Sequence, residues 1–184
     1  MFDRFTNSAR YVTTIAERAA RQLHHPQVEP EHLLIGLVVD PEAVAAKVLT
    51  SFGVVPSALG DTLVAQLAPG RSAAKGPVRY GRDAKKVMRM AIKESQAPKT
   101  PFIGTQHLLL ALLRDGSRQT DASFAAAGLN LDAVRARTLQ LTSPDGPALR
   151  DPERTPEERA QEKGLRITGV VIDPAADPSA GPPT

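Results

Sequence analysis

Two similar segments carry the side chains best suited to chemistry. Residues 29–37 read EPEHLLIGL and residues 104–112 read GTQHLLLAL, so each has a histidine followed by two leucines. The first segment has an acid, Glu31, before its histidine, whereas the second has the neutral Gln106. A carboxylate beside an imidazole is able to move a proton or to bind a cation. The question is whether these residues form a catalytic site, a binding site or part of the core.

The histidines favour a structural interpretation. His32 and His107 occupy equivalent places in the two segments, and each precedes a leucine-rich run. A histidine bonded to a helix end explains this better than a metal ligand does. His24 and His25 precede a proline at a predicted helix end, where a cation suits the helix dipole. No spacing singles out a nucleophile for a Ser-His-Asp set, so we predict no catalytic residue, no metal, no cofactor and no enzyme activity.

The composition excludes further classes of protein. The 184 residues include no cysteine, which removes disulfides, thiol catalysis and most structural zinc sites. No apolar run approaches the ~18 residues needed to span a bilayer. The first ten residues, MFDRFTNSAR, have no signal-peptide core. We therefore expect a soluble, cytoplasmic protein that has no membrane partner.

Charge and proline content divide the chain into a body and a tail. Positions 1–149 hold 18 basic and 13 acidic residues, whereas positions 150–184 hold five and seven. Eight of the 16 prolines lie at or after Pro144. This distribution predicts a globular body over 1–142 and a Pro-rich, mostly disordered tail over 143–184. Within the tail, a short helix and a β-like run are expected at 155–163 and 164–174.

The body contains an internal repeat with an offset of 75 residues. The offset aligns a proline, a histidine and a glycine of each half without a gap, over about fifty residues. Such self-similarity indicates a tandem duplication of one supersecondary unit. We therefore expect repeat one at 1–68, a linker at 69–78 and repeat two at 79–142.

Each repeat reads as four helices, which predicts an all-α fold of eight helices without a convincing strand. Apolar residues recur at three- and four-residue spacing in 9–23 and 84–92, and the two His-Leu-Leu segments follow as second helices. Thr105 is placed to cap the second of these, and Pro30 suits a first turn in the other. Gly53 and Gly128 are expected as C-caps. The remaining helices are expected at about 42–52, 56–67, 117–127 and 131–141.

With this layout, residues 1–142 resemble the N-terminal (Clp repeat) domain of the Clp/Hsp100 unfoldases, closest to the ClpC type. The similar segments are MFDRFTNSAR, EHLLIGLVVDPEAVAAKVLTSFGV, RDAKKVMRMAIKES and GTQHLLLALLRDG. The unfoldases carry ATPase rings with a Gly-rich phosphate loop that ends in Gly-Lys-Ser/Thr. The sequence has no such loop, so the resemblance implies a stand-alone recognition domain without the ATPase modules.

The resemblance also implies phosphoarginine-binding pockets, one per repeat. The family builds each from a threonine at the start of the first helix and the glutamate of the Glu-His motif. These map to Thr6 and Glu31 in repeat one and to Gly81 and Gln106 in repeat two, so the first pocket is expected to bind and the second to be degenerate. A hydroxyl donates to a phosphoryl oxygen, and a carboxylate accepts from a guanidinium. The alternative is a plain N-cap at Thr6 and a first-turn acid at Glu31.

A hydrophobic patch is the second site that the resemblance implies. Phe2, Tyr80 and Lys85 match positions at which the ClpC family binds adaptors, hydrophobic partners and cyclic peptides of the cyclomarin kind. Arg89 stands where family members often carry an acid, which puts the cyclic-peptide affinity in doubt. Tyr80 could instead pack between the two halves.

Residues 71–93 include eight basic side chains and one acid. The positive charges surround a predicted helix and have little aromatic interleaving, so a solvated face or an adaptor surface is favoured over nucleic-acid binding. We predict a non-catalytic module that binds Clp adaptors or substrates, including arginine-phosphorylated proteins, and so modulates or competes with the Clp unfoldase. The alternatives are a scaffold that acts through its C-terminal tail and a weak nucleic-acid-binding protein.

Overall fold

The computed structural model describes residues 3–71, 76–96, 101–143, 149–153 and residue 158. Eight α-helices lie within this part of the chain, and the second four follow the first four in the same order. They are α1 (Asn7–Gln22), α2 (Pro30–Val38), α3 (Val44–Ser51), α4 (Pro56–Gln66), α5 (Arg82–Gln96), α6 (Thr105–Asp115), α7 (Arg118–Ala126) and α8 (Leu131–Thr142). The predicted all-α duplicated fold is confirmed, and the predicted ends of α3, α4, α7 and α8 differ from these by at most two residues.

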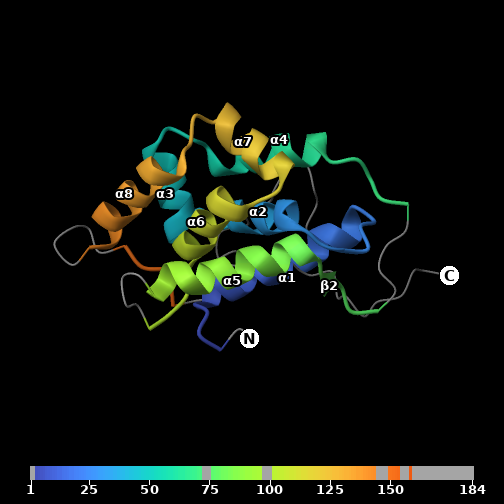
Figure 1. The fold of residues 1–184 in the computed structure, drawn as a ribbon, viewed down its shortest axis with the longest axis horizontal. Coiled ribbons are helices and arrows are strands. Elements are labelled where there is room, and N and C mark those ends of the chain that lie inside the picture. The colour runs from blue at the N-terminus through green and yellow to red at the C-terminus, as the bar shows by residue number, and fades with distance from the viewer. Residues whose placement is uncertain (1–2, 72–75, 97–100, 144–148, 154–157, 159–184) are drawn as a thin grey trace.

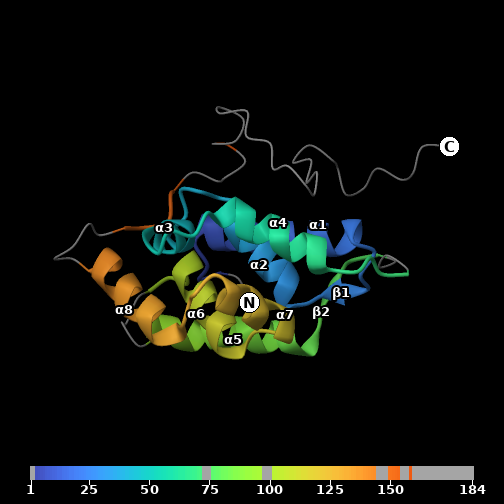
Figure 2. The same ribbon diagram turned by 90° about the horizontal axis from the view of Figure 1, so that it is seen from above.

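The two sets of helices form two sides of one body. Figure 2 shows α1, α3 and α4 along one side and α5, α7 and α8 along the other. Helix α2 is buried over its whole length, from Pro30 to Val38. Helix α6 is buried from His107 to Leu112. These two leucine-rich helices therefore supply the shared core, as their apolar composition predicts.

Helix α1 is amphipathic and packs closely against α2. The Thr6 side chain caps α1 by accepting a hydrogen bond from the Ala9 N–H at 3.1 Å. Gly36 of α2 touches the α1 backbone, because a Cβ added there would lie 2.4 Å from the Val12 carbonyl oxygen. The close approach therefore requires glycine at this position.

The chain leaves α3 and α7 through glycines in the left-handed region, as the sequence predicts. Gly53 has a φ of 76° and Gly128 a φ of 69°. The N–H after each glycine donates back to the last turn of the helix, at 3.2 Å to Leu49 and 2.9 Å to Phe124. These are Schellman C-caps, which satisfy carbonyls that the helix itself leaves unpaired.

Two details correct the expectations from sequence. Gly104, and not Thr105, is the N-cap of α6, and Thr105 is its first residue. The body also contains two short strands, β1 (Gln27–Val28) and β2 (Arg79–Tyr80), which pair in parallel. Two residues are too few for a periodicity signal, and the partner strand lies in the other repeat, so the sequence did not reveal this pairing.

A second connection between the repeats mirrors the first. Phe5 forms an isolated parallel bridge with Ile103, and Val28 pairs with Tyr80. The offset of 75 residues relates these two pairs, because it carries Phe5 onto Tyr80 and Val28 onto Ile103. Each repeat therefore joins the segment before its first helix to the segment before the second helix of the other repeat.

Part of the predicted tail lies on the body. The Leu149 N–H donates to the Leu141 carbonyl oxygen at 2.8 Å, next to the end of α8 (Figure 1). The helix and the β-like run expected at 155–163 and 164–174 lie outside the described residues, apart from Glu158. In the described part, no single helix is long and apolar enough to cross a membrane; α3 and α4 reach the threshold only as a pair bent by 95°.

Candidate functional site

The two residues expected to form the first pocket lie at opposite ends of a helical hairpin. Helix α2 runs back along α1, because the Ser8 hydroxyl at the start of α1 donates at 3.2 Å to Asp40, just beyond the end of α2. Thr6 precedes α1 and lies near that end, whereas Glu31 lies in the first turn of α2. The structure therefore does not bring Thr6 and Glu31 together.

The second repeat separates its pair in the same way. Lys86, near the start of α5, forms a 2.6 Å ion pair with Asp115 at the end of α6. Gly81 precedes α5, and Gln106 lies in the first turn of α6. The antiparallel hairpin of α5 and α6 therefore does not bring Gly81 and Gln106 together.

The two bridges between the repeats regroup these four residues. The Thr6 N–H donates to the Ile103 carbonyl at 3.0 Å, which places Thr6 at the start of α6. The Gly81 N–H donates to the Val28 carbonyl at 2.8 Å, which places Gly81 at the start of α2. Two sites result, which we name for the helix that begins there. They are the α6-end site (Thr6, Val44, Thr105, Gln106) and the α2-end site (Glu29, Pro30, Glu31, Gly81).

The α6-end site holds a carboxylate from the C-terminal segment. The hydroxyl and the N–H of Thr105 donate to Asp151 at 2.7 and 2.8 Å, and the Thr6 hydroxyl donates to it at 2.7 Å. The Val44 N–H, in the first turn of α3, donates at 3.0 Å. Asp151 is a site residue that the sequence analysis missed, since no motif or spacing links it to residues so far away in the chain.

The α2-end site is acidic. Glu31 is only 8% exposed, and its Oε2 has no hydrogen-bond partner among the described residues. The Glu29 carboxylate fills the space beside Gly81, where an added Cβ would lie 2.3 Å from Oε1. Burial raises the pKa of Glu29, a hydrogen bond from Gln27 opposes this, and the nearby charges of Glu31 and Asp83 raise it further. Two carboxylates that repel each other favour a cation between them.

The same positions have opposite chemistry in the two sites. The offset of 75 residues pairs Thr6 with Gly81 and Pro30 with Thr105, so the α2-end site lacks both hydroxyls, and a proline has no N–H to donate. Glu31 pairs with Gln106, whose Oε1 is likewise buried without a partner in the described part of the chain. One site therefore presents donors for an anion, and the other presents an acid.

The histidines have the structural role that the sequence predicts. His32 Nδ1 accepts from the Glu29 N–H at 2.9 Å, and His107 Nδ1 accepts from the Gly104 N–H at 3.0 Å. Each imidazole thus caps the N-terminus of its own helix, α2 or α6, from the first turn. Burial lowers the pKa of both to about 4; the charge of His25 adds to this for His32. The described residues contain no group of three side chains suited to a metal ion.

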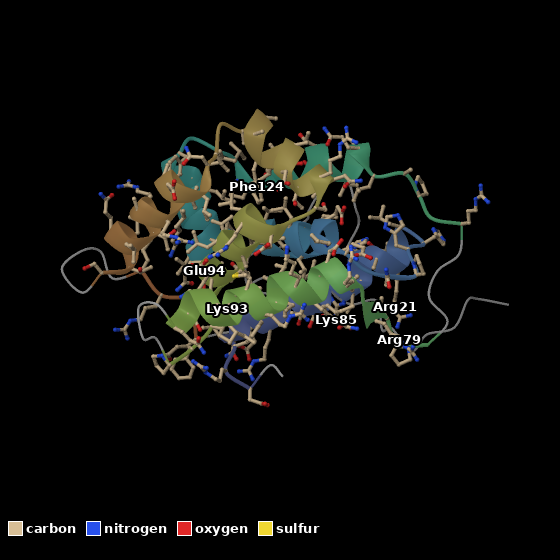
Figure 3. All side chains as sticks on the ribbon, viewed as in Figure 1. Arg21, Arg79, Lys85, Lys93, Glu94 and Phe124 are labelled. Atoms are coloured by element: carbon tan, nitrogen blue, oxygen red, sulfur yellow. The ribbon has the colours of Figure 1, made fainter. Side chains whose placement is uncertain are left out.

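The residues of the predicted hydrophobic patch have different surroundings. Phe2 lies outside the described residues. Tyr80 is half-buried, and its hydroxyl donates to Glu17 at 2.9 Å. Burial raises the pKa of Tyr80, and the charge of Glu17 raises it further. Lys85 and Arg89 are exposed on α5, along which Figure 3 places Lys85.

The basic surface is partly neutralised. Figure 3 shows Arg21 and Arg79 at the end of the molecule where β2 lies, away from Lys93 farther along α5. Arg21 donates to the Gly76 carbonyl at 2.8 Å, and Arg82 pairs with Asp83 at 3.0 Å. The positive charges are therefore spread over separate elements.

Comparison with known proteins identifies the family. Residues 4–127 match the family model of the Clp repeat (R) N-terminal domain. The ATP-dependent Clp protease ATP-binding subunit ClpC of Staphylococcus epidermidis is 34% identical over 146 residues, which cover 79% of this chain and 18% of that protein. The chain thus spans about a fifth of the length of such relatives.

Solved structures have the same fold. The Hsp104 N-terminal domain from Candida albicans has a TM-score of 0.65 at 22% identity, over 77% of this chain and 93% of that one. The ClpV N-domain in complex with VipB peptide has a TM-score of 0.62 at 18% identity, over 77% and 89%. The repeat, the fold and these matches agree, and the chain belongs to the family of Clp repeat N-terminal domains.

Proposed function

We propose that this protein is a non-catalytic protein-binding module that recognises basic segments of Clp substrates or adaptors at the α2-end site. The buried Glu31 carboxylate, whose Oε2 lacks a partner in the described part of the chain, carries the proposal. A buried acceptor without a donor is costly, and a guanidinium supplies two donors in a planar fork. An arginine side chain that reaches Glu31 would satisfy this oxygen and reduce the repulsion from Glu29.

The residue types at this site favour arginine over phosphoarginine. A phosphoryl group needs hydrogen-bond donors, and the α2-end site has Gly81 and Pro30 where the α6-end site has Thr6 and Thr105. A phosphate would also lie near two carboxylates. The hydroxyl donors lie at the α6-end site and the buried glutamate at the α2-end site. We therefore expect an unmodified arginine to bind the α2-end site more tightly than phosphoarginine does.

Peptide binding is in keeping with the family. A structural neighbour, the ClpV N-domain, was solved as a complex with a VipB peptide, so this fold is able to present a peptide surface. A module that takes up the same segments as a Clp unfoldase would compete with it for substrates or adaptors and thereby modulate proteolysis. In such a competition, the exposed Lys85 and the half-buried Tyr80 are candidate adaptor contacts beside α5.

Peptide titration tests the proposal. A fluorescent peptide that contains arginine, phosphoarginine or citrulline at one position is titrated against the wild type and a Glu31→Gln variant. Loss of a charged hydrogen bond costs about 1.5–3 kcal/mol, so the arginine peptide should bind the variant at least about tenfold more weakly. The citrulline peptide should bind both proteins weakly.

Asp132→Asn is the matched control, because Asp132 is an exposed acid in the first turn of α8. It removes the same charge and should leave the arginine peptide's affinity unchanged. Equal affinity of the wild type and Glu31→Gln for the arginine peptide would overturn the proposal. Tighter binding of the phosphoarginine peptide that depends on Glu31 would keep the site and reverse its ligand preference.

A further inference from the structure

We propose that the α6-end site is an anion-binding site that the protein closes with its own Asp151, so that residues 149–153 act as a tethered ligand in competition with the acidic side chain of a partner. The inference concerns the α6-end site alone. It does not depend on whether Glu31 binds arginine.

The site is complete for a carboxylate. Four donors from three separate segments converge on Asp151. Oδ2 accepts from the Thr6 hydroxyl and the Thr105 N–H, and Oδ1 accepts from the Thr105 hydroxyl and the Val44 N–H. Two of the donors are N–H groups in the first turns of α6 and α3, where the helix dipole favours negative charge.

The two hydroxyl protons point at the carboxylate because the hydroxyl oxygens are already used as acceptors. Thr6 Oγ1 accepts from the Ala9 N–H at 3.1 Å, and Thr105 Oγ1 accepts from the Ala45 N–H at 3.1 Å. Thr105 is fully buried, so its side chain is held in this orientation. The donors are therefore preorganised for an anion and remain so when Asp151 leaves.

The segment that carries Asp151 lies at the surface and is held at both ends. The Leu149 N–H donates to Leu141 at 2.8 Å, and Asn7 Nδ2 donates to the Glu153 carbonyl at 2.6 Å. Asp151 is half-buried and Glu153 is exposed. Displacing these residues therefore breaks a few hydrogen bonds and the packing of the half-buried Leu149 against the core, but it leaves the eight helices in place, as a reversible closure needs.

The arrangement of donors selects the competing ligand. Two donors meet each oxygen of Asp151, so the site accommodates one anionic group that presents two oxygens, as a carboxylate does. Gln106 Oε1 lies beside them, since a Cβ added at Gly104 would be 2.3 Å from it and 2.9 Å from Asp151 Oδ2. The Gln106 amide brings no negative charge, whereas a glutamate there would repel an anion. The neutral residue at 106 thus suits an anion site.

An NMR titration of the full chain tests the closure. The amide signals of Val44 and Thr105 are followed in the wild type and in an Asp151→Asn variant while an acetylated and amidated peptide of residues 149–153 is added. We expect the variant to bind this peptide at least tenfold more tightly than the wild type, with shifts at these two amides. The same peptide with asparagine in place of the aspartate should not bind. Acetate and inorganic phosphate, titrated separately, distinguish a carboxylate ligand from a phosphoryl ligand.

Two further variants keep the test decisive. Thr105→Val, combined with Asp151→Asn, removes one donor and should abolish the shifts caused by the peptide. Asn7→Ala loosens the segment while the four donors stay in place, so its affinity should lie between those of the wild type and Asp151→Asn. Equal peptide affinity of the wild type and both single variants, or no binding to any of them, would overturn the proposal.

Discussion

His32 donates a hydrogen bond from Nε2 to Nδ1 of His25 across 2.8 Å, and the direction of this bond is determined at both ends. His32 Nδ1 already accepts from the Glu29 N–H, so its proton lies on Nε2. His25 Nε2 lies 2.9 Å from the Ala68 carbonyl oxygen, to which it must donate, so its Nδ1 is the acceptor. These bonds place the ring proton of each histidine on Nε2, and a second proton on His32 Nδ1 would break its hydrogen bond with the Glu29 N–H.

The stability of the protein should fall between pH 6.5 and 4. The pKa of both His32 and His107 is lowered from 6.5 to about 4, so the unfolded chain binds more protons over this range. The free energy of unfolding is highest above pH 6.5, where both histidines are neutral in the folded and the unfolded chain. It falls as the pH drops towards 4, by on the order of 3 kcal/mol per histidine. Urea denaturation at pH 7.5, 6, 5 and 4 measures it. A free energy of unfolding that does not change from pH 7.5 to 4.5 would contradict it.

Replacing His32 by leucine should destabilise the protein by about 1–3 kcal/mol. The substitution leaves the part-buried Glu29 N–H without its acceptor and His25 without its donor. The variant should also lose part of the pH dependence, because one of the two shifted histidines is gone. Urea denaturation at pH 7.5 and 5 measures both effects, and His107→Leu provides the comparison in the second repeat. An unchanged midpoint at pH 7.5 would refute this interpretation.

Glu94→Gln should cost about 1–3 kcal/mol in the free energy of unfolding. Glu94 is 8% exposed and pairs with Arg135 at 2.8 Å and Arg114 at 3.5 Å, so the change removes the charge that two arginines share. Asp83→Asn is the matched control. Asp83 pairs with an Arg82 side chain that is 90% exposed, and such a surface pair contributes about 0–1 kcal/mol. Equal effects of the two variants in thermal or urea unfolding would show that burial does not matter here.

Thr105→Val should lower stability by about 1–3 kcal/mol with no change in side-chain shape. The variant loses the hydroxyl that donates to Asp151 and accepts from the Ala45 N–H, both at a fully buried position. Thr62→Val is the control, because Thr62 is exposed and bonds only within its own helix, to Ala58. The control should change the free energy by less than about 0.5 kcal/mol. Equal midpoints of Thr105→Val and the wild type would argue against the hydrogen bonds at this site.

Much of the fold could be predicted from local patterns. The constant offset of 75 residues indicated the duplication, and apolar periodicity indicated the helices. Gly53 and Gly128 predicted the ends of α3 and α7, because a left-handed residue after a helix is a local requirement. The structural role of His32 and His107 was also predictable, since each stands near the start of a buried helix.

The grouping of the site residues was decided by the tertiary structure alone. Thr6 and Glu31 belong to one repeat, yet an antiparallel hairpin separates them, and the Phe5–Ile103 bridge joins Thr6 to the other repeat. Asp151 reaches the same site from beyond α8. Residue types and helix positions follow from the sequence, because propensity and burial pattern act over short stretches of chain. Which helix ends meet depends on how two such units pack, and that is a long-range property that no single segment encodes.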